Sequence, residues 1–314
     1  CCVARLLSGH ICGDHWPLPP EASNEICEQH LPKRHAVPRF FKVRSEAQGD
    51  VGAEELKVAY NRIHGDYDAF WLSEAGKPVR DLVERLPFKG RQRVFEAGCG
   101  TGYATVMIAK RVGAAGEVCA ADLSEGMIAE ARARARAEGI ENIRFIAGDA
   151  VELLETESLF DTVFTSWVLG YIPVTPFFRR ARNALKPGGR LAFVVHKENS
   201  PREPLDIFWD IVAEDPSVLE KRVAFDFPRD LEHVRSELRS AGFEVEHLWD
   251  GQITFHYNTR DEVLEHLLKS GAGTAFYDAV DPRRRKALEQ RFLDTLSSRQ
   301  AEERGFEVVH DHIS

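Results

Sequence analysis

Three glycines at alternate positions, Gly98, Gly100 and Gly102, follow an apolar run and precede a helical pattern that starts near Tyr103. The apolar run carries an acidic residue, Glu96, close to its end. Glycines lack the Cβ atom that holds a ligand away from the backbone, and the amides at a helix N-terminus point at whatever lies there. The segment therefore predicts a buried strand, a tight turn and a helix that together hold a nucleotide-like ligand.

The spacing of these glycines argues against two common nucleotide-binding turns. A dinucleotide-binding turn has the pattern G-x-G-x-x-G, and a P-loop ends in Gly-Lys-Ser or Gly-Lys-Thr. Here the pattern is E-x-G-x-G-x-G with Tyr at position 103, and no Lys follows the last glycine.

Two aspartates follow the next two predicted strands. Asp122 ends the apolar run 118–121, twenty residues after Gly102, and Asp149 follows the predicted strand 142–147. A carboxylate at the tip of the second strand is suited to accept hydrogen bonds from both ribose hydroxyls. Each aspartate could alternatively cap a helix or belong to an ordinary turn. Their order after the glycine turn favours a shared ligand.

Together with segments 160–166 and 185–195, these features resemble five motifs of the class I S-adenosyl-L-methionine (SAM)-dependent methyltransferases. The resemblance covers roughly residues 90–196. It implies a Rossmann-like α/β fold with a seven-stranded sheet, mostly parallel with the last strand antiparallel, and helices on both faces. In that family the fourth-strand motif, here 160–166, faces the methyl group being transferred.

The resemblance further implies SAM as the cofactor and a small molecule as the methyl acceptor. The segment 59–71 is similar to the N-terminal segment of quinone-biosynthesis methyltransferases and their small-molecule relatives. Its aromatic residues could stabilise the sulfonium, or simply dock a helix on the core. The residues expected to bind the cofactor are Glu96, Gly98, Cys99, Gly100, Gly102, Asp122, Leu123, Met127, Asp149, Ala150, Ser166 and Tyr60.

The chemistry expected from this resemblance is an in-line displacement that releases S-adenosylhomocysteine (SAH). A general base helps when the acceptor is an oxygen or a carbon, whereas a neutral amine needs less help. His196 is the first candidate base because it ends the fifth predicted strand, and sites of open α/β sheets lie outside such ends. His64 and Tyr171 are further candidates. Each of the three could instead make a structural hydrogen bond.

The first thirty-five residues hold four of the six cysteines, with two C-x-x-H pairs formed by Cys12, His15, Cys27 and His30. Thiolate and imidazole ligands at this spacing are typical of a closed tetrahedral zinc site. The alternatives are an unstructured leader, a disulfide pair or a sequence fragment. A first residue other than Met also suggests a fragment. The segment 1–50 is expected to be separate from a methyltransferase domain at 51–314, with a helical insert, a candidate lid, at about 258–300.

The composition makes some classes of function unlikely. The net charge of −9 over 314 residues makes a nucleic-acid partner unlikely, because such a surface is normally basic. No apolar stretch reaches the length of a membrane span, and a cytoplasmic enzyme is expected. Two alternatives stay open: a protein or RNA methyltransferase that uses the Cys/His segment for recognition, and a non-catalytic SAM-binding protein. The sequence does not indicate the acceptor or the oligomeric state.

Overall fold

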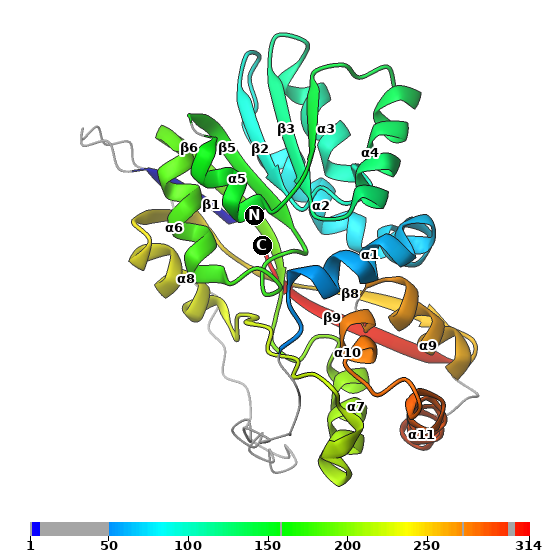
Figure 1. Cartoon of the computed structure of the whole chain (residues 1–314). Coiled ribbons are helices and arrows are strands. Elements are labelled where there is room, and N and C mark those ends of the chain that lie inside the picture. The colour runs from blue at the N-terminus through cyan, green and yellow to red at the C-terminus, as the bar shows by residue number, and fades with distance from the viewer. Residues whose placement is uncertain (1, 7–49, 158, 272, 301–304) are drawn as a thin grey trace, which may run out of the picture.

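A twisted sheet with the strand order β4-β3-β2-β5-β6-β1-β7 forms the centre of the protein (Figure 1). In the computed structural model, residues 2–6, 50–157, 159–271, 273–300 and 305–314 are described. Strands β2 to β6 pair in parallel, whereas β1 is antiparallel to both β6 and β7. The strands are β1 (Cys2–Leu6), β2 (Arg93–Ala97), β3 (Glu117–Asp122), β4 (Ile143–Ala147), β5 (Phe160–Ser166), β6 (Leu185–His196) and β7 (Phe243–His247).

Helices cover both faces of this sheet because its inner strands are apolar on both sides. Val94 and Phe164 join one core with α2, α3 and α4, whereas their neighbours Phe95 and Val163 join a second core with α5, α6 and α8. The helices are α1 (Ala53–Tyr67), α2 (Ser73–Arg85), α3 (Tyr103–Val112), α4 (Glu125–Ala137), α5 (Ala150–Thr156), α6 (Val174–Ala184), α7 (Arg202–Glu214) and α8 (Leu231–Ser240), with a π-helical turn η1 (Asp68–Leu72) and a 3₁₀ turn η2 (Pro216–Val218).

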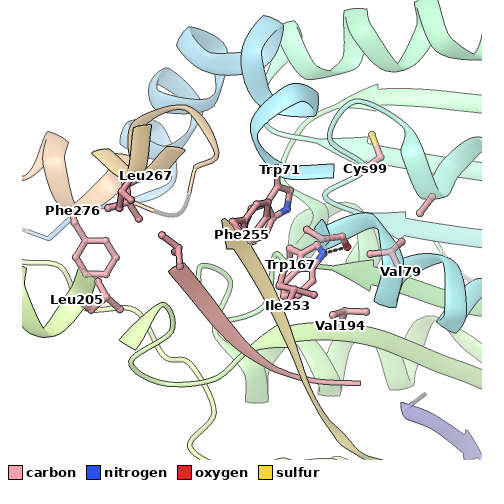
Figure 2. Packing of buried hydrophobic residues seen from close by; sticks show 14 of the residues in the cluster. Trp71, Val79, Cys99, Trp167, Val194, Leu205, Ile253, Phe255, Leu267 and Phe276 are labelled. Atoms are coloured by element: carbon pink, nitrogen blue, oxygen red, sulfur yellow. Dashed lines mark hydrogen bonds between the residues drawn. The ribbon is translucent and has the colours of Figure 1, made fainter. Parts of the chain in front are cut away.

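A long antiparallel ladder, β8 (Asp250–Tyr257) with β9 (Phe306–Ile313), extends from the tip of β6. Between these two strands lie α9 (Arg260–Lys269), α10 (Thr274–Asp278) and α11 (Arg285–Arg299). The ladder packs against η1 and the loop after β5. Figure 2 shows Trp71, Trp167 and Phe255 packed together there, and the Trp71 and Phe255 rings stack with centroids 5.6 Å apart.

The predicted fold is confirmed: a mostly parallel seven-strand path with helices on both faces and a helical insert before the last strand of the chain. One detail differs from the expectation. The antiparallel place between β6 and β7 is taken by β1, and β9 is antiparallel to β6 only at its last two pairs. The reason is that β9 pairs over its whole length with β8. In the described part of the chain, no helix is both long and apolar enough to cross a membrane.

Candidate active site

The glycine turn joins β2 to α3 with three left-handed residues. Gly98, Gly100 and Gly102 have φ angles of 67°, 52° and 82°. A Cβ on Gly98 would lie 2.2 Å from Val168 Cγ2, and one on Gly102 would lie 2.9 Å from the Ala131 Cβ. A Cβ on Gly100 would meet nothing within 4 Å. Two of the glycines thus permit close packing, and the third borders open space.

Asp122 ends β3 beside this turn. Its Oδ2 accepts the Gly100 N–H and its Oδ1 accepts the Ser124 N–H, both at 2.9 Å. Burial raises the pKa of this carboxyl, and the two backbone hydrogen bonds oppose that rise. A carboxylate offers about four lone-pair sites, so acceptor capacity remains after these two contacts. The backbone therefore fixes a carboxylate that can still accept hydrogen bonds from a ligand.

Asp149 follows β4 and caps α5. Its Oδ1 accepts the N–H of Val151 at 2.7 Å and that of Glu152 at 3.3 Å. Asp149 and its neighbour Ala150 line the same cavity as Asp122. Parallel strands β3 and β4 are adjacent, so their carboxyl ends bring both carboxylates to one side of the glycine turn.

One face of α1 forms the opposite wall of the cavity. It is lined by Ala53, Leu56, Lys57 and Tyr60, which stand at positions i, i+3, i+4 and i+7, and Tyr67 joins them two turns further on. This spacing is that of one helix face.

Asn61 holds α1 in place over the end of β3. Its Oδ1 accepts the Ser124 hydroxyl at 2.7 Å and the Gly126 N–H at 3.0 Å. Both donors lie at the start of α4, so a single side chain joins two elements that enclose the cavity. This contact depends on the sequence of α1 as well as on the glycine turn.

The loop after β5 closes the remaining side. Ser166, Val168 and Tyr171 line the cavity together with Trp167, which has a positive φ of 64°. A positive φ is uncommon for a bulky residue and costs of order 1 kcal/mol or more. The Trp167 Nε1–H donates to the Ala75 carbonyl at 3.1 Å, which holds the side chain in the core.

The enclosed space is about 310 Å³ and is bordered by three tyrosines, Tyr60, Tyr67 and Tyr171. This size falls within the usual range for small-molecule sites. Burial raises the pKa of all three phenols, to about 12 for Tyr171. A hydrogen bond between the side chains of Tyr60 and Tyr171 opposes the rise at Tyr171. At neutral pH these groups therefore keep their protons.

Most of the residues predicted to bind the cofactor surround this space. Those that line it are Gly98, Gly100, Asp122, Leu123, Met127, Asp149, Ala150, Ser166 and Tyr60. Cys99 and Gly102 are buried in the turn, where Gly102 packs on α4. Glu96 is 1% exposed beneath the turn, and burial raises its pKa to about 8, with the Asp122 charge adding to the shift. These three residues shape the turn and do not border the cavity.

Two of the three candidate bases lie elsewhere, which corrects the expectation for them. His196 is 4% exposed and packs on Trp167, with ring centroids 4.6 Å apart. Burial and the neighbouring His312 lower its pKa to about 3. The tip of β6 is covered by β9, so the strand end faces a core instead of a ligand. His64 contacts Glu130 through Nδ1 at 3.2 Å outside the cavity. Of the three candidate bases, only Tyr171 lines the cavity.

No described residue of the helical insert lines the cavity either. It packs on the outer face of α1, where Arg62 and Asp278 form an ion pair at 2.9 Å. Gly271, at the end of α9, lies against Tyr60, since a Cβ there would be 2.9 Å from the phenol oxygen. The insert therefore supports the wall of the site from outside.

The proposed zinc ligands Cys12, His15, Cys27 and His30 lie outside the described residues. Within the described ranges, no group of three His, Cys, Asp or Glu side chains could hold a metal ion.

Sequence reasoning missed several lining residues: Val51, Leu56, Lys57, Val168, Ile172 and Pro173. The helical spacing of Ala53, Leu56, Lys57 and Tyr60 was a usable signal, because it extends the face that carries Tyr60. Val168, Ile172 and Pro173 lie in an irregular loop and have no such pattern.

Comparison with known proteins gives matches to methyltransferases. A family model described as a methyltransferase domain matches residues 94–189, which include the glycine turn and both aspartates. A demethylmenaquinone methyltransferase of Lactococcus lactis is 26% identical over 251 residues, covering 70% of this chain and 96% of that protein. The aklanonic acid methyltransferase DauC of a Streptomyces species is 31% identical over 144 residues, covering 45% of this chain. The match spans 64% of DauC, less than two thirds of its length.

Among solved structures, a Bacillus halodurans protein assigned to the methyltransferases aligns with a TM-score of 0.54 and 20% identity. The alignment covers 76% of this chain and 96% of that one. This likeness shows the fold.

Proposed function

We propose that this chain, whose residues 94–189 match a methyltransferase domain, transfers the methyl group of SAM to a small-molecule acceptor held in this cavity, with release of SAH. The observation that carries the proposal is the Asp122 carboxylate, fixed by the Gly100 and Ser124 amides at the edge of the cavity. SAM supplies an electrophilic methyl group on a sulfonium.

The lining residues divide by chemistry along the cavity. Asp122 would accept the ribose hydroxyls, and Asp149 with Ala150 would border the adenine. The open space at Gly100 admits a ligand against the backbone, which a larger residue would block. Tyr60 and Tyr67 offer π faces that attract a sulfonium. What remains for the protein is alignment of the acceptor and exclusion of water.

A small, conjugated acceptor such as a quinone-like compound is supported by two relatives, a demethylmenaquinone methyltransferase and an aklanonic acid methyltransferase. The cavity favours this class over a macromolecule, because α1 encloses it and most of its wall is apolar or aromatic. Methylation of a protein or RNA through the Cys/His segment, with or without zinc, remains the alternative, as does SAM binding without catalysis. A cytoplasmic location also stays a prediction.

The test is release of SAH from SAM by the purified chain. The acceptor panel would hold hydroquinones, aromatic hydroxy acids, total RNA and an acidic protein extract. The proposal expects turnover only with members of the first two classes and loss of that turnover in Asp122→Ala. Turnover with RNA or protein alone, or SAM binding with no turnover on any member, would contradict it.

A further inference from the structure

Among the described residues that line the cavity, no side chain is suited to remove a proton from an acceptor. Six titratable residues among the described ones line it: Lys57, Tyr60, Tyr67, Asp122, Asp149 and Tyr171. A general base must reach the proton that it removes and must be deprotonated near the operating pH. Lys57 is a cation, and each of the other five either lies out of reach of the acceptor or keeps its proton at neutral pH.

The two carboxylates lie on the far side of the glycine turn from the β5 loop. The strand order β4-β3-β2-β5 places Asp122 and Asp149 on one flank of β2 and Tyr171 on the other. Both oxygens of Asp122 accept backbone N–H groups, and Asp149 caps α5. They are fixed where the cofactor's nucleoside would lie. No described carboxylate lines the cavity on the β5 flank.

The tyrosines on the acceptor side hold their protons. Burial raises the pKa of Tyr171 to about 12, and it raises the pKa of Tyr60 and Tyr67 as well. A phenol in this state donates a hydrogen bond and does not accept a proton at neutral pH.

Lys57 is the one cation among the described residues that line the cavity. It is half-buried, and no hydrogen bond or ion pair joins it to another described residue. By contrast, Lys221 nearby pairs with Glu55 at 2.6 Å. An ammonium that borders a largely apolar cavity and makes no direct ion pair favours an anionic ligand.

The two ends of α1 are held against different sides of the cavity. The Val51 N–H donates to the Arg222 carbonyl at 2.9 Å, and the Asp226 N–H donates to the Gly170 carbonyl at 3.0 Å. The segment 222–226 thus links the start of α1 to the β5 loop, while Asn61 joins the later part of α1 to the end of β3. Lys57 lies in the first half of the helix.

We propose that the acceptor enters the cavity already ionised, as a conjugated carboxylate, phenolate or enolate, and that Lys57 binds its negative charge. This inference rests on the proposed function. A lone pair of the anion forms the new bond to the methyl carbon while the carbon–sulfur bond breaks, and its electron pair stays on sulfur. The anion and the sulfonium both become neutral, and no proton moves. This reaction needs no base, in agreement with the described lining of the cavity.

The test compares two probes that differ in charge, 1-hydroxy-2-naphthoate and its methyl ester, bound to the full chain saturated with SAH at pH 7.5. The wild type is expected to bind the anion at least about tenfold more tightly than the ester, the size of one charge-assisted contact. Lys57→Met should remove this preference, and Lys57→Arg should keep most of it. Lys89→Met, at an exposed position outside the cavity, is the matched control.

A second arm separates the acceptor from the cofactor, whose amino-acid portion also carries a carboxylate. SAH and 5′-methylthioadenosine, which lacks that portion, are titrated into wild type and Lys57→Met. If Lys57→Met leaves the affinity for each of the two ligands unchanged, Lys57 does not bind the cofactor, which supports acceptor binding. If the variant binds SAH more weakly but 5′-methylthioadenosine equally well, Lys57 binds the cofactor's carboxylate and the inference is overturned. A wild type that binds SAH but shows no preference for the anion also overturns it. A wild type that does not bind SAH refutes the proposed function itself.

Discussion

The N–H of Gly100 donates to Oδ2 of Asp122 at 2.9 Å and so joins the glycine turn to the tip of the neighbouring strand. The two residues meet because β2 and β3 pair in parallel with Ala97 opposite Ala121. The same carboxylate accepts the Ser124 N–H at the start of α4. One side chain therefore fixes the turn and the next helix against each other at the edge of the cavity.

Gly98→Ala and Gly100→Ala should separate packing from ligand binding. Both substitutions put a Cβ on a left-handed residue, which costs about 1 kcal/mol. Gly98→Ala adds a contact of 2.2 Å with Val168 and should lower the free energy of unfolding by about 3 kcal/mol or more. Gly100→Ala meets nothing in the protein, so its stability loss should stay near 1 kcal/mol.

The affinity for SAH distinguishes the two variants further. Gly100 lines the cavity and its new methyl would meet no protein atom, so we expect it to contact the ligand and to lower SAH affinity at least about tenfold in a folded protein. Urea unfolding and calorimetric titration measure the two effects. Equal stability losses, or full SAH affinity in Gly100→Ala, would contradict this division.

Gly271→Ala should weaken the site from outside the cavity. The new Cβ would lie 2.9 Å from the Tyr60 oxygen, at a residue with φ of 86°, so Tyr60 must move or the loop must strain. We expect a stability loss of about 1–2 kcal/mol and a several-fold weaker affinity for SAH. Gly65→Ala is the control, because it is a helical position with open space and should be neutral or slightly stabilising. Unchanged SAH affinity in Gly271→Ala would show that the insert does not support Tyr60.

Acid should destabilise the protein through its buried histidines. Burial lowers the pKa of His266 to about 4 from 6.5, and His196, His310 and His312 shift in the same direction. Their stabilising contribution is present above pH 6.5 and is lost as the pH falls toward 4, because the unfolded chain binds the protons first. Each such group steepens the loss by up to about 1.4 kcal/mol per pH unit.

His266→Phe should therefore flatten the dependence of the unfolding free energy on pH between 6.5 and 4.5. Glu96, with its pKa raised to about 8, acts in the opposite sense between pH 4.5 and 8, but it is common to both proteins. A slope for His266→Phe equal to that of the wild type would refute the assignment.

The site residues that belong to local sequence motifs could be predicted from the sequence. Gly98, Gly100, Asp122 and Asp149 follow consecutive strands, and the parallel order of those strands brings them together whatever surrounds them. His196 also follows a strand, but the prediction for it failed geometrically because β9 covers that strand end. Whether a strand end is open depends on distant segments, which no local pattern reveals.

Lys57 was missed for a related reason. The helical spacing shows that Lys57 shares a face with Tyr60, but it is the contacts of Asn61 with Ser124 and Gly126 that hold this face against the cavity. The place of β1 between β6 and β7 was equally hidden, since strand pairing over such a separation leaves no periodic signal.

Titration of the purified chain with SAH, together with Asp122→Ala and the exposed neighbour variant Glu125→Ala, tests the central claim most directly. The account predicts micromolar binding by the wild type and by Glu125→Ala. It also predicts an affinity at least about 100-fold lower in Asp122→Ala, because two charge-assisted hydrogen bonds are lost. A folded wild type that does not bind SAH, or an Asp122→Ala variant that binds it equally well, would contradict the account.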